Sequence, residues 1–300
     1  MKTVRLNVIY LLMLFYTSLY AKNDFQASYG MLKPHDRYLA IKPYISLNPS
    51  KPREKSPLAI MMPGCLGWHP HHEEWRKKLI DLGFVVLYVD SFKARGLNSQ
   101  SVLMKNVCSG KLVHGDERAG DVIAVLSEVL KDRSIDSEKI IIMGWSHGGW
   151  AALDLLVMQE NGIVPPNLSE NPLEPDTEIS LALLYYPYCG SNTVNWQQKL
   201  PHSTSGFLFH GNKDRITSHR KCSLRLRRDK STRIEFKEIK NAKHWFDNYT
   251  NSQTFNRRAT NLTVSLSMRA IDELLYQKKQ GQKPKFKQES LIELFNGIND

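Results

Sequence analysis

Residues 139–150 read KIIIMGWSHGGW, and this stretch decides the fold. Its apolar start has the composition of a buried strand, and an apolar helical pattern follows at 147–158. Between them, Ser146 stands two residues after Gly144 and two before Gly148, which is the G-x-S-x-G pattern of a nucleophile elbow. The glycines leave room for a tight turn, and the helix start directs backbone N–H groups toward the serine oxygen. The stretch predicts Ser146 as a nucleophile, with a plain glycine-rich turn as the alternative.

Strands and helices alternate on both sides of this stretch. Amphipathic patterns predict further helices at 72–82, 116–130 and 255–276. Apolar runs predict strands at 57–62, 84–89, 179–186 and 206–209, with one nearer an edge at 233–239. This order predicts an α/β fold with a mostly parallel central sheet, helices on both faces and a site at the carboxyl ends of the strands. Two segments are expected outside the core: a hairpin or loop at 42–57, and a proline-rich surface insertion at 159–178 that is a candidate rim of the site.

An acid and a base are expected downstream of the serine. A serine hydroxyl needs a base to take its proton, and the base needs an orienting carboxylate. In this type of fold the acid comes next along the chain and the histidine last. Asp214 follows the strand at 206–209, and His244 lies in the loop after the strand at 233–239. We therefore expect a Ser146–Asp214–His244 triad, with a turn residue and a surface histidine as the alternatives; Asp247 is a rival acid but lies too near His244 in sequence and on its far side.

Six segments together resemble a known family. They are PGCLGWHPHHEEW, LGFVVLYVDSFKARG, ERAGDVIAVL, GWSHGGW, GNKDRIT and AKHWFD, spread over roughly residues 56–275. They resemble the dienelactone hydrolase family of α/β-hydrolases, most closely its exported bacterial members. The resemblance implies an eight-stranded type of sheet, a nucleophile–Asp–His triad that falls on Ser146, Asp214 and His244, and neither a metal nor another cofactor. Dienelactone hydrolases proper use a cysteine nucleophile, so the serine here favours a general esterase.

Two backbone amides are the candidates for an oxyanion hole. One belongs to His147, directly after the serine, and the other to Cys65 in the loop after the strand at 57–62, with Leu66 as the alternative. That loop is also explained if it only lets the chain leave the sheet. Arg118 and Asp121 share the helix predicted at 116–130, where a buried ion pair near the site and a solvated helix face are both open.

Three functions remain open from the sequence. The first is a serine hydrolase that cleaves an ester or related acyl bond of a small molecule through an acyl-enzyme. The second is an oligopeptidase-type peptidase, since the doubled glycine after the serine is shared with that type. Such peptidases normally carry an extra propeller or a long amino-terminal domain, whereas only about 35 residues of a mature chain precede the first strong strand here. The third is a binding protein that kept the fold without catalysis. The histidines of WHPHH at 68–72 suggest a metal site, but they lack a second cluster and are expected to cap a helix.

The amino terminus predicts export. Residues 1–21 combine Lys2 and Arg5 with an uncharged, mostly apolar run and small residues, which resembles a signal peptide cleaved after Ala21. The run is short for an anchor helix, so no stable membrane insertion is expected after cleavage. The predicted organisation is a signal peptide at 1–21, an α/β-hydrolase domain at 22–280 and a basic, polar tail at 281–300. An exported protein is periplasmic or secreted, where disulfides form.

Four cysteines fit an oxidising compartment. They are Cys65, Cys108, Cys189 and Cys222, without the close pairs of a structural zinc site. The bond Cys189–Cys222 is favoured because both residues are expected near the Asp214 loop; Cys108 is the other candidate partner of Cys189, and free buried thiols are the alternative.

The charge of the chain excludes little by itself. The net charge is +11, from 41 basic and 30 acidic residues, and residues 213–243 hold twelve Lys or Arg against four acids. No nucleic-acid-binding motif accompanies this excess, and stacking aromatics do not interleave with it, so no nucleic-acid partner is expected. A solvated basic face is the simplest interpretation.

Overall fold

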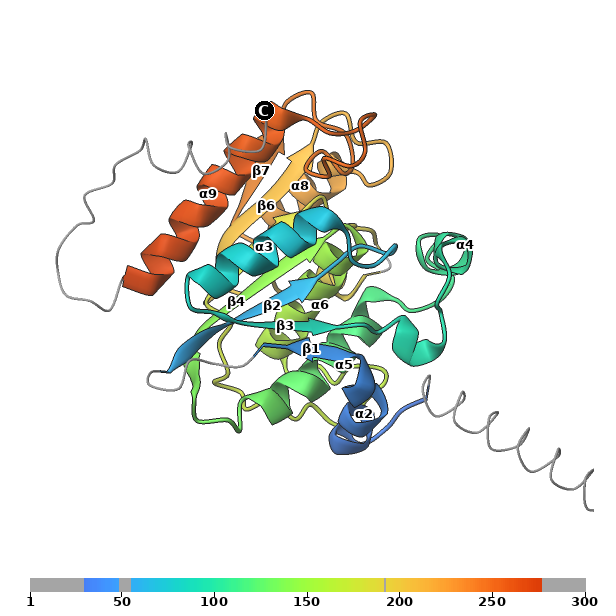
Figure 1. Cartoon of the computed structure of the whole chain (residues 1–300), viewed down its shortest axis with the longest axis vertical. Coiled ribbons are helices and arrows are strands. Elements are labelled where there is room, and N and C mark those ends of the chain that lie inside the picture. Colours follow the sequence, from blue (N-terminus) through green and yellow to red (C-terminus); the bar gives the residue numbers. More distant parts are fainter. Residues whose placement is uncertain (1–29, 49–54, 192, 277–300) are drawn as a thin grey trace, which may run out of the picture.

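A seven-stranded sheet forms the centre of the computed structural model, which describes residues 30–48, 55–191 and 193–276 (Figure 1). The strand order is β1-β3-β2-β4-β5-β6-β7, and only β1 runs antiparallel to its neighbour. The strands are β1 Ile45–Leu47, β2 Ser56–Met62, β3 Val85–Val89, β4 Ile135–Trp145, β5 Leu181–Tyr185, β6 Ser205–Gly211 and β7 Arg233–Ile239. The predicted mostly parallel sheet is confirmed, and β7 lies at the predicted edge. The resemblance implied an eight-stranded type of sheet, whereas the described residues hold seven strands.

Helices cover both faces of the sheet (Figure 1). The helices are α2 Pro34–Ile41, α3 Pro70–Asp81, α4 Gln100–Val102, α5 Gly115–Val129, α6 His147–Asn161, α7 Val194–Gln197, α8 His219–Arg228 and α9 Arg257–Tyr276. Shorter helical turns follow at Lys42–Tyr44, Lys93–Arg95 and Leu103–Val107. In β2, Leu58 and Ile60 face a core shared with α5 and α6, while Ala59 and Met61 face a core shared with α3 and α9. This alternation explains why β2 reads as an unbroken apolar run, since both of its faces are buried.

Sequence analysis did not predict helix α8, and it misplaced the segment at 159–178. Helix α8 has a strongly basic sequence in which only Cys222, Arg225 and Leu226 are buried, so its apolar stripe is too narrow to detect. The insertion expected at 159–178 is not a rim of the site. Its residue Asn167 is buried and donates to Asp121 Oδ1 at 2.9 Å, which holds the segment against α5.

Two disulfides join segments that follow the carboxyl ends of the strands, and Cys222 lies in α8. Cys189 bonds to Cys222, as predicted, and Cys65 bonds to Cys108, so the alternative pairing of Cys189 with Cys108 is wrong. The Cα atoms lie 5.1 and 5.2 Å apart, respectively. Each bond closes a loop of the unfolded chain, which typically stabilises the fold by about 2–4 kcal/mol.

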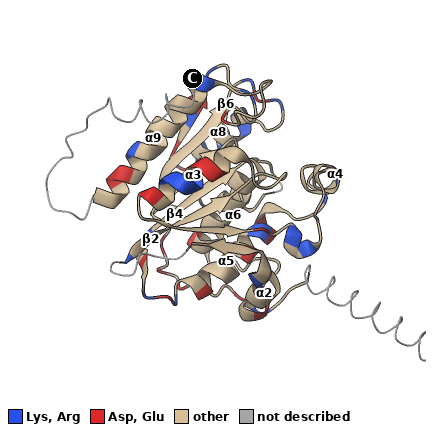
Figure 2. Ribbon diagram, viewed as in Figure 1, with Lys and Arg blue, Asp and Glu red and all other residues tan. Residues whose placement is uncertain are grey.

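The predicted signal peptide at 1–21 and the tail at 281–300 lie outside the described residues. Within the described part of the chain, none of the helices has the length and apolar character needed to cross a bilayer. Along α3, two acidic residues are followed by three basic residues and then by Asp81 (Figure 2). In the basic region predicted at 213–243, the side chains of Arg220, Lys221, Arg227 and Arg228 on α8 are exposed, which agrees with a solvated face.

Candidate active site

Ser146 sits on a strained turn between β4 and α6. Its φ angle is 53°, a left-handed conformation that is costly for a residue with a side chain. The Ser146 N–H donates to the carbonyl of Tyr185 at 2.8 Å, which anchors the turn to β5. Gly148 is required because a Cβ there would collide with the carbonyl oxygens of Met62 and Pro63. The turn thus needs the glycine that the sequence motif predicts, and it projects the serine at the carboxyl edge of the sheet.

The structure brings Ser146, His244 and Asp214 into one chain of hydrogen bonds. His244 Nε2 lies 2.8 Å from Ser146 Oγ, and His244 Nδ1 lies 2.7 Å from Asp214 Oδ2. The backbone N–H groups of Ile216 and Thr217 donate to Asp214 Oδ1 at 2.8 and 3.0 Å. Burial by itself raises the pKa of the Asp214 carboxyl, but His244 and the N–H of Thr217 outweigh it, and the pKa lies below its ordinary value. Asp214 is therefore a carboxylate oriented toward the imidazole.

The rival acid Asp247 has a different place. Its Oδ2 accepts a hydrogen bond from Trp145 Nε1 at 2.8 Å, and its Oδ1 accepts one from the hydroxyl of Tyr186 at 2.6 Å. The Tyr186 ring in turn lies 4.6 Å from the His244 ring. Asp247 thus binds Trp145 and Tyr186, which surround the site, and it does not bind the imidazole. The carboxylate next to His244 belongs to Asp214.

The two candidate oxyanion segments lie side by side. Gly64 approaches so closely that a Cβ there would lie 3.5 Å from the Cβ of Ser146, and Cys65 follows it in the turn. His147 is the first residue of α6, where helix N–H groups lack acceptors within the helix. The imidazole of His147 is buried, and burial followed by the nearby Arg118 lowers its pKa to about 3. His147 is therefore neutral at neutral pH, and its Nδ1 lies 3.2 Å from an Arg118 nitrogen.

Comparisons with known proteins identify the fold. The profile of the prolyl oligopeptidase family matches residues 70–162, from the start of α3 through α6. Among curated proteins, no sequence matches the chain. A structure from Klebsiella pneumoniae, provisionally described as a dienelactone hydrolase, is similar with a TM-score of 0.57 at 15% identity, covering 76% of this chain and 92% of that one.

Two further solved structures are similar. A dienelactone hydrolase-like promiscuous phosphotriesterase from metagenomic libraries has a TM-score of 0.54 at 18% identity, covering 77% of this chain and 99% of that one. The propionate-bound esterase 2 of the planctomycete Thermogutta terrifontis also has a TM-score of 0.54 at 18% identity, covering 79% and 91%. The chain has the α/β-hydrolase fold. The predicted fold class and the resemblance to dienelactone hydrolase-like proteins are confirmed at this level.

A cavity of about 470 Å³ opens above Ser146 in this α/β-hydrolase fold. Besides Ser146 and His244, its walls are mainly apolar or aromatic, and they come from the start of α6 and from segments that follow the carboxyl ends of the other strands. The exposed side chains Met104 and Ile216 stand at its walls, with 55% and 74% of their surface accessible. The remaining lining includes Leu66, Val107, Trp150, Tyr188 and Trp245. Sequence analysis missed this wall because its residues are scattered over α6 and the segments that follow five different strands, with no shared pattern.

The WHPHH histidines form an aromatic cluster on the other side of the elbow. His69 N–H donates to His72 Nδ1 at 2.9 Å at the start of α3, so the predicted helix cap is confirmed. The rings of His71 and His72 lie 3.9 Å apart, and the His72 ring lies 4.7 Å from the Trp145 ring. Burial lowers the pKa of His71 and, more strongly, that of His72. These histidines are neutral packing groups beneath the elbow.

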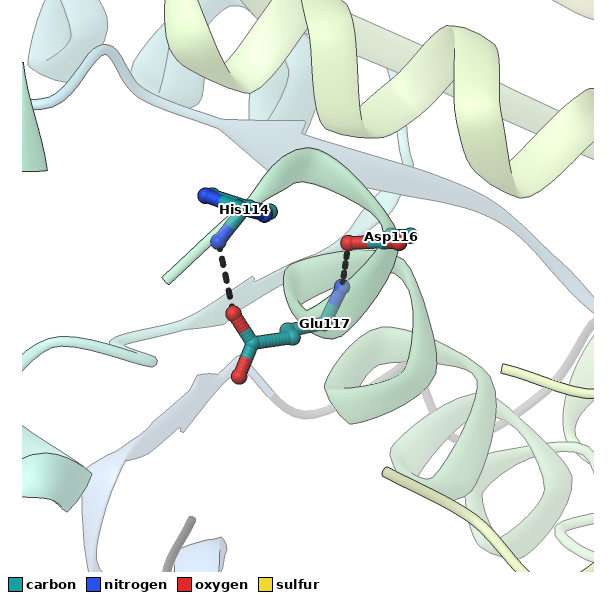
Figure 3. Close-up of side chains that lie close together, drawn as sticks. All are labelled: His114, Asp116 and Glu117. Carbon is teal, nitrogen blue, oxygen red and sulfur yellow. Dashed lines mark hydrogen bonds between the residues drawn. The ribbon is translucent and has the colours of Figure 1, made fainter. Parts of the chain in front are cut away.

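A second group of chemically suggestive side chains lies at the start of α5. Figure 3 shows His114, Asp116 and Glu117, whose ligand atoms lie within 4.8 Å of one another. Glu117 Oε2 accepts the N–H of His114 at 2.8 Å, and Asp116 Oδ1 accepts the N–H of Glu117 at 2.9 Å. These bonds satisfy free N–H groups at the helix start, which accounts for the arrangement as a helix cap.

Four buried charged groups lie behind the elbow. Asp121 Oδ1 accepts from Arg37 Nε at 2.7 Å, and Asp121 Oδ2 accepts from Arg95 at 2.5 Å. Burial raises the pKa of Asp121, but Arg95 and Arg37 outweigh it and hold the pKa below its ordinary value. Asp121 therefore bonds to residues distant in sequence, and Arg118 turns toward the elbow. The expectation of a solvated helix face at Arg118 and Asp121 is wrong, since both are buried.

Proposed function

We propose that this protein is a serine hydrolase that cleaves carboxylic esters or related acyl bonds of small molecules. The observation that carries the proposal is the hydrogen-bonded chain Ser146–His244–Asp214 at the floor of an apolar cavity. The strained elbow supports it as well, because such backbone conformations persist where the surrounding structure enforces them and they cluster at active sites. Cys65 and His147 are the proposed backbone donors of the oxyanion hole.

The mechanism follows from these positions. His244 takes the proton of Ser146 Oγ as the oxygen attacks the acyl carbon, and the Asp214 carboxylate stabilises the imidazolium that forms. The carbonyl oxygen becomes an oxyanion that the N–H groups of Cys65 and His147 bind. His244 then gives its proton to the leaving alcohol, and an acyl-enzyme remains on Ser146. Water activated by His244 repeats these steps and releases the acid.

The cavity supports an uncharged substrate. Its described lining contains no Asp, Glu, Lys or Arg side chain, so a charged acyl or alcohol group finds no partner there.

We also propose that the protein is exported, with a signal peptide at 1–21; the two disulfides are consistent with an oxidising compartment. A further parallel comes from a similar solved structure not named above, the Thermogutta terrifontis esterase 2 phosphorylated by paraoxon.

Labelling with a fluorophosphonate and with paraoxon tests the proposal. Both reagents are expected to add one phosphorus group to Ser146, which peptide mass spectrometry locates. Ser146→Ala is expected to fold normally, to take up no label and to hydrolyse p-nitrophenyl acetate at least about a thousandfold more slowly. Wild-type protein that takes up no label and does not hydrolyse short esters would refute the proposal. It would favour a binding protein that kept the fold without catalysis.

An oligopeptidase-type peptidase is a second candidate, because the profile of the prolyl oligopeptidase family matches residues 70–162. Parallel assays with matched p-nitroanilide peptides and p-nitrophenyl esters separate the two activities. The ester hydrolase proposal expects turnover of the esters and no measurable release of p-nitroaniline from the peptides. Peptide turnover at a comparable kcat/KM, abolished by Ser146→Ala, would favour the peptidase.

A further inference from the structure

Arg118 is a buried cation with an unusual set of partners. Only 2% of its surface is accessible, and burial lowers the pKa of its guanidinium to about 10, so it remains charged at neutral pH. Within residues 30–48, 55–191 and 193–276, it makes no salt bridge to a carboxylate and its Nε has no hydrogen-bond partner. Its neighbours Arg37 and Arg95 both bind Asp121 instead. Asp90 and Asp121 favour the charged form of Arg118, but neither forms a salt bridge with it. A buried charge without a direct salt bridge is costly to a fold, which calls for a functional explanation.

The guanidinium joins the two candidate oxyanion segments. A single nitrogen, Nη1, donates to the carbonyl of Pro63 at 3.0 Å and lies 3.2 Å from His147 Nδ1. Pro63 comes two residues before Cys65, and His147 directly follows Ser146. The Phe92 ring lies 4.6 Å from the Arg118 guanidinium carbon. Among the described residues, one side-chain nitrogen therefore connects the loop after β2 to the first residue of α6.

Backbone packing also holds these two segments together. Gly148 lies against the carbonyls of Met62 and Pro63 so closely that no Cβ fits between them. This contact sets how near α6 and the loop approach, and the Cys65–Cys108 disulfide restrains the loop further on. The hydrogen bond from Arg118 to Pro63 adds a restraint before Cys65, and its bond to His147 restrains the start of α6.

We propose that Arg118 is a positioning residue of the oxyanion hole: it holds the amides of Cys65 and His147 in register and places a buried positive charge behind the developing oxyanion. The inference rests on the proposed function. Donors that are fixed in place before the reaction stabilise an oxyanion without reorganising. A buried cation adds to this effect because the surrounding medium screens it weakly. Other nearby groups also act on the pKa of Arg118: Tyr88, Asp90 and Asp121 raise it, and Arg95 lowers it.

Phenylboronic acid distinguishes this role from ordinary binding. Ser146 Oγ forms a bond to boron, its proton passes to His244, and boron becomes a tetrahedral anion with a hydroxyl in the oxyanion hole. Affinity for the boronate therefore reports stabilisation of the transition state, whereas KM for a neutral ester reports mainly the ground state where chemistry is slow. Arg118→Met is expected to lower kcat for p-nitrophenyl acetate about a hundredfold and to weaken boronate binding to a similar extent, with KM changed less than about threefold.

Two further variants make the test decisive. Arg225→Met removes another buried arginine that donates to backbone carbonyls, those of Asn195 and Gln198, and it is expected to lower Tm while kcat and boronate affinity stay at the wild-type level. Arg118→Lys keeps the charge without the guanidinium geometry and is expected to fold and to lose about tenfold in both quantities. If Arg118→Met is inactive because it does not fold, wild-type kcat and boronate affinity in Arg118→Lys overturn the inference.

The outcomes separate the inference from the proposed function. Wild-type protein that does not react with a fluorophosphonate overturns both. Normal wild-type reactivity together with unchanged boronate affinity in Arg118→Met overturns the positioning role alone. Equal losses of kcat in Arg118→Met and Arg225→Met, in proportion to their Tm, also overturn it, because a purely structural role predicts that pattern.

Discussion

Asp247 Oδ2 accepts a hydrogen bond from Trp145 Nε1 at 2.8 Å, and this bond ties the loop of His244 to the residue before Ser146. The other oxygen of Asp247 accepts the hydroxyl of Tyr186, whose ring lies against His244. Asp247 thus joins three segments that each position part of the candidate site. Its carboxylate orients the surroundings of His244, while the carboxylate of Asp214 binds the imidazole itself.

This division of roles predicts different losses for two equivalent substitutions. Asp214→Asn is expected to lower kcat by about three to four orders of magnitude, because the amide no longer stabilises the imidazolium. Asp247→Asn keeps one acceptor for Trp145 or Tyr186 and is expected to lower kcat only about tenfold, with a clear drop in Tm. Steady-state kinetics with p-nitrophenyl acetate and thermal unfolding measure both. Equal losses of kcat would show that the two carboxylates do not have separate roles.

Sequence alone could predict the elbow and its two partners because each is marked locally. Ser146 lies between glycines at a strand–helix junction, and Asp214 and His244 follow strands whose carboxyl ends share one edge of the sheet. The roles of Arg118 and Asp247 depend on contacts with segments distant in sequence. In the sequence, Arg118 is one of several charged residues in a predicted helix, and only the structure shows its contacts with Pro63 and His147. The cavity wall at Met104 has no periodic signal at all.

The two disulfides are expected to differ in their effect on activity. Cys65, the proposed oxyanion donor, is bonded to Cys108, and both line the cavity. Replacing both by Ala is expected to lower kcat about tenfold or more, because the loop of Cys65 loses a restraint at the reaction centre. The double variant Cys189→Ala/Cys222→Ala is the matched control and is expected to lower stability by about 2–4 kcal/mol with a smaller effect on kcat. Urea unfolding and ester kinetics test both variants, and a larger loss of kcat in the control would reverse the assignment.

Buried histidines predict a loss of stability in acid. Burial lowers the pKa of His210 to about 4, although the nearby Asp214 opposes the shift, and the pKa of His147 lies at about 3. Because these folded-state values lie below the unfolded value of about 6.5, the unfolded chain binds more protons between them. Their contribution to stability is complete above about pH 6.5 and decreases as the pH falls toward 4. His210 alone accounts for about 3 kcal/mol across that range.

Urea unfolding at several pH values between 7 and 4 measures this effect. The variant His210→Asn is expected to flatten the pH dependence, whereas His202→Asn, at an exposed position, is expected to leave it unchanged. A free energy of unfolding that is constant between pH 6.5 and 4.5 would show that the buried histidines are protonated in the folded protein.

Two glycines at opposite ends of α6 provide the last prediction. At Gly148, a Cβ would collide with the carbonyls of Met62 and Pro63, which belong to the rigid end of β2 and the loop that follows. At Gly162, φ is +63° but no heavy atom lies within 4 Å of an added Cβ. Gly162→Ala is therefore expected to lower stability by about 1 kcal/mol, the usual cost of a left-handed conformation for alanine, and to keep wild-type kcat.

Gly148→Ala is expected to behave differently, because relief of the collision must move the elbow away from the loop of Cys65. We expect a loss of kcat and of fluorophosphonate labelling of at least about a hundredfold, since a displacement of about 1 Å at a reaction centre has an effect of this size. Labelling rates per folded molecule, with the folded fraction taken from circular dichroism, separate this loss from unfolding. Wild-type labelling of folded Gly148→Ala would mean that the spacing between the elbow and the oxyanion loop does not control the reaction.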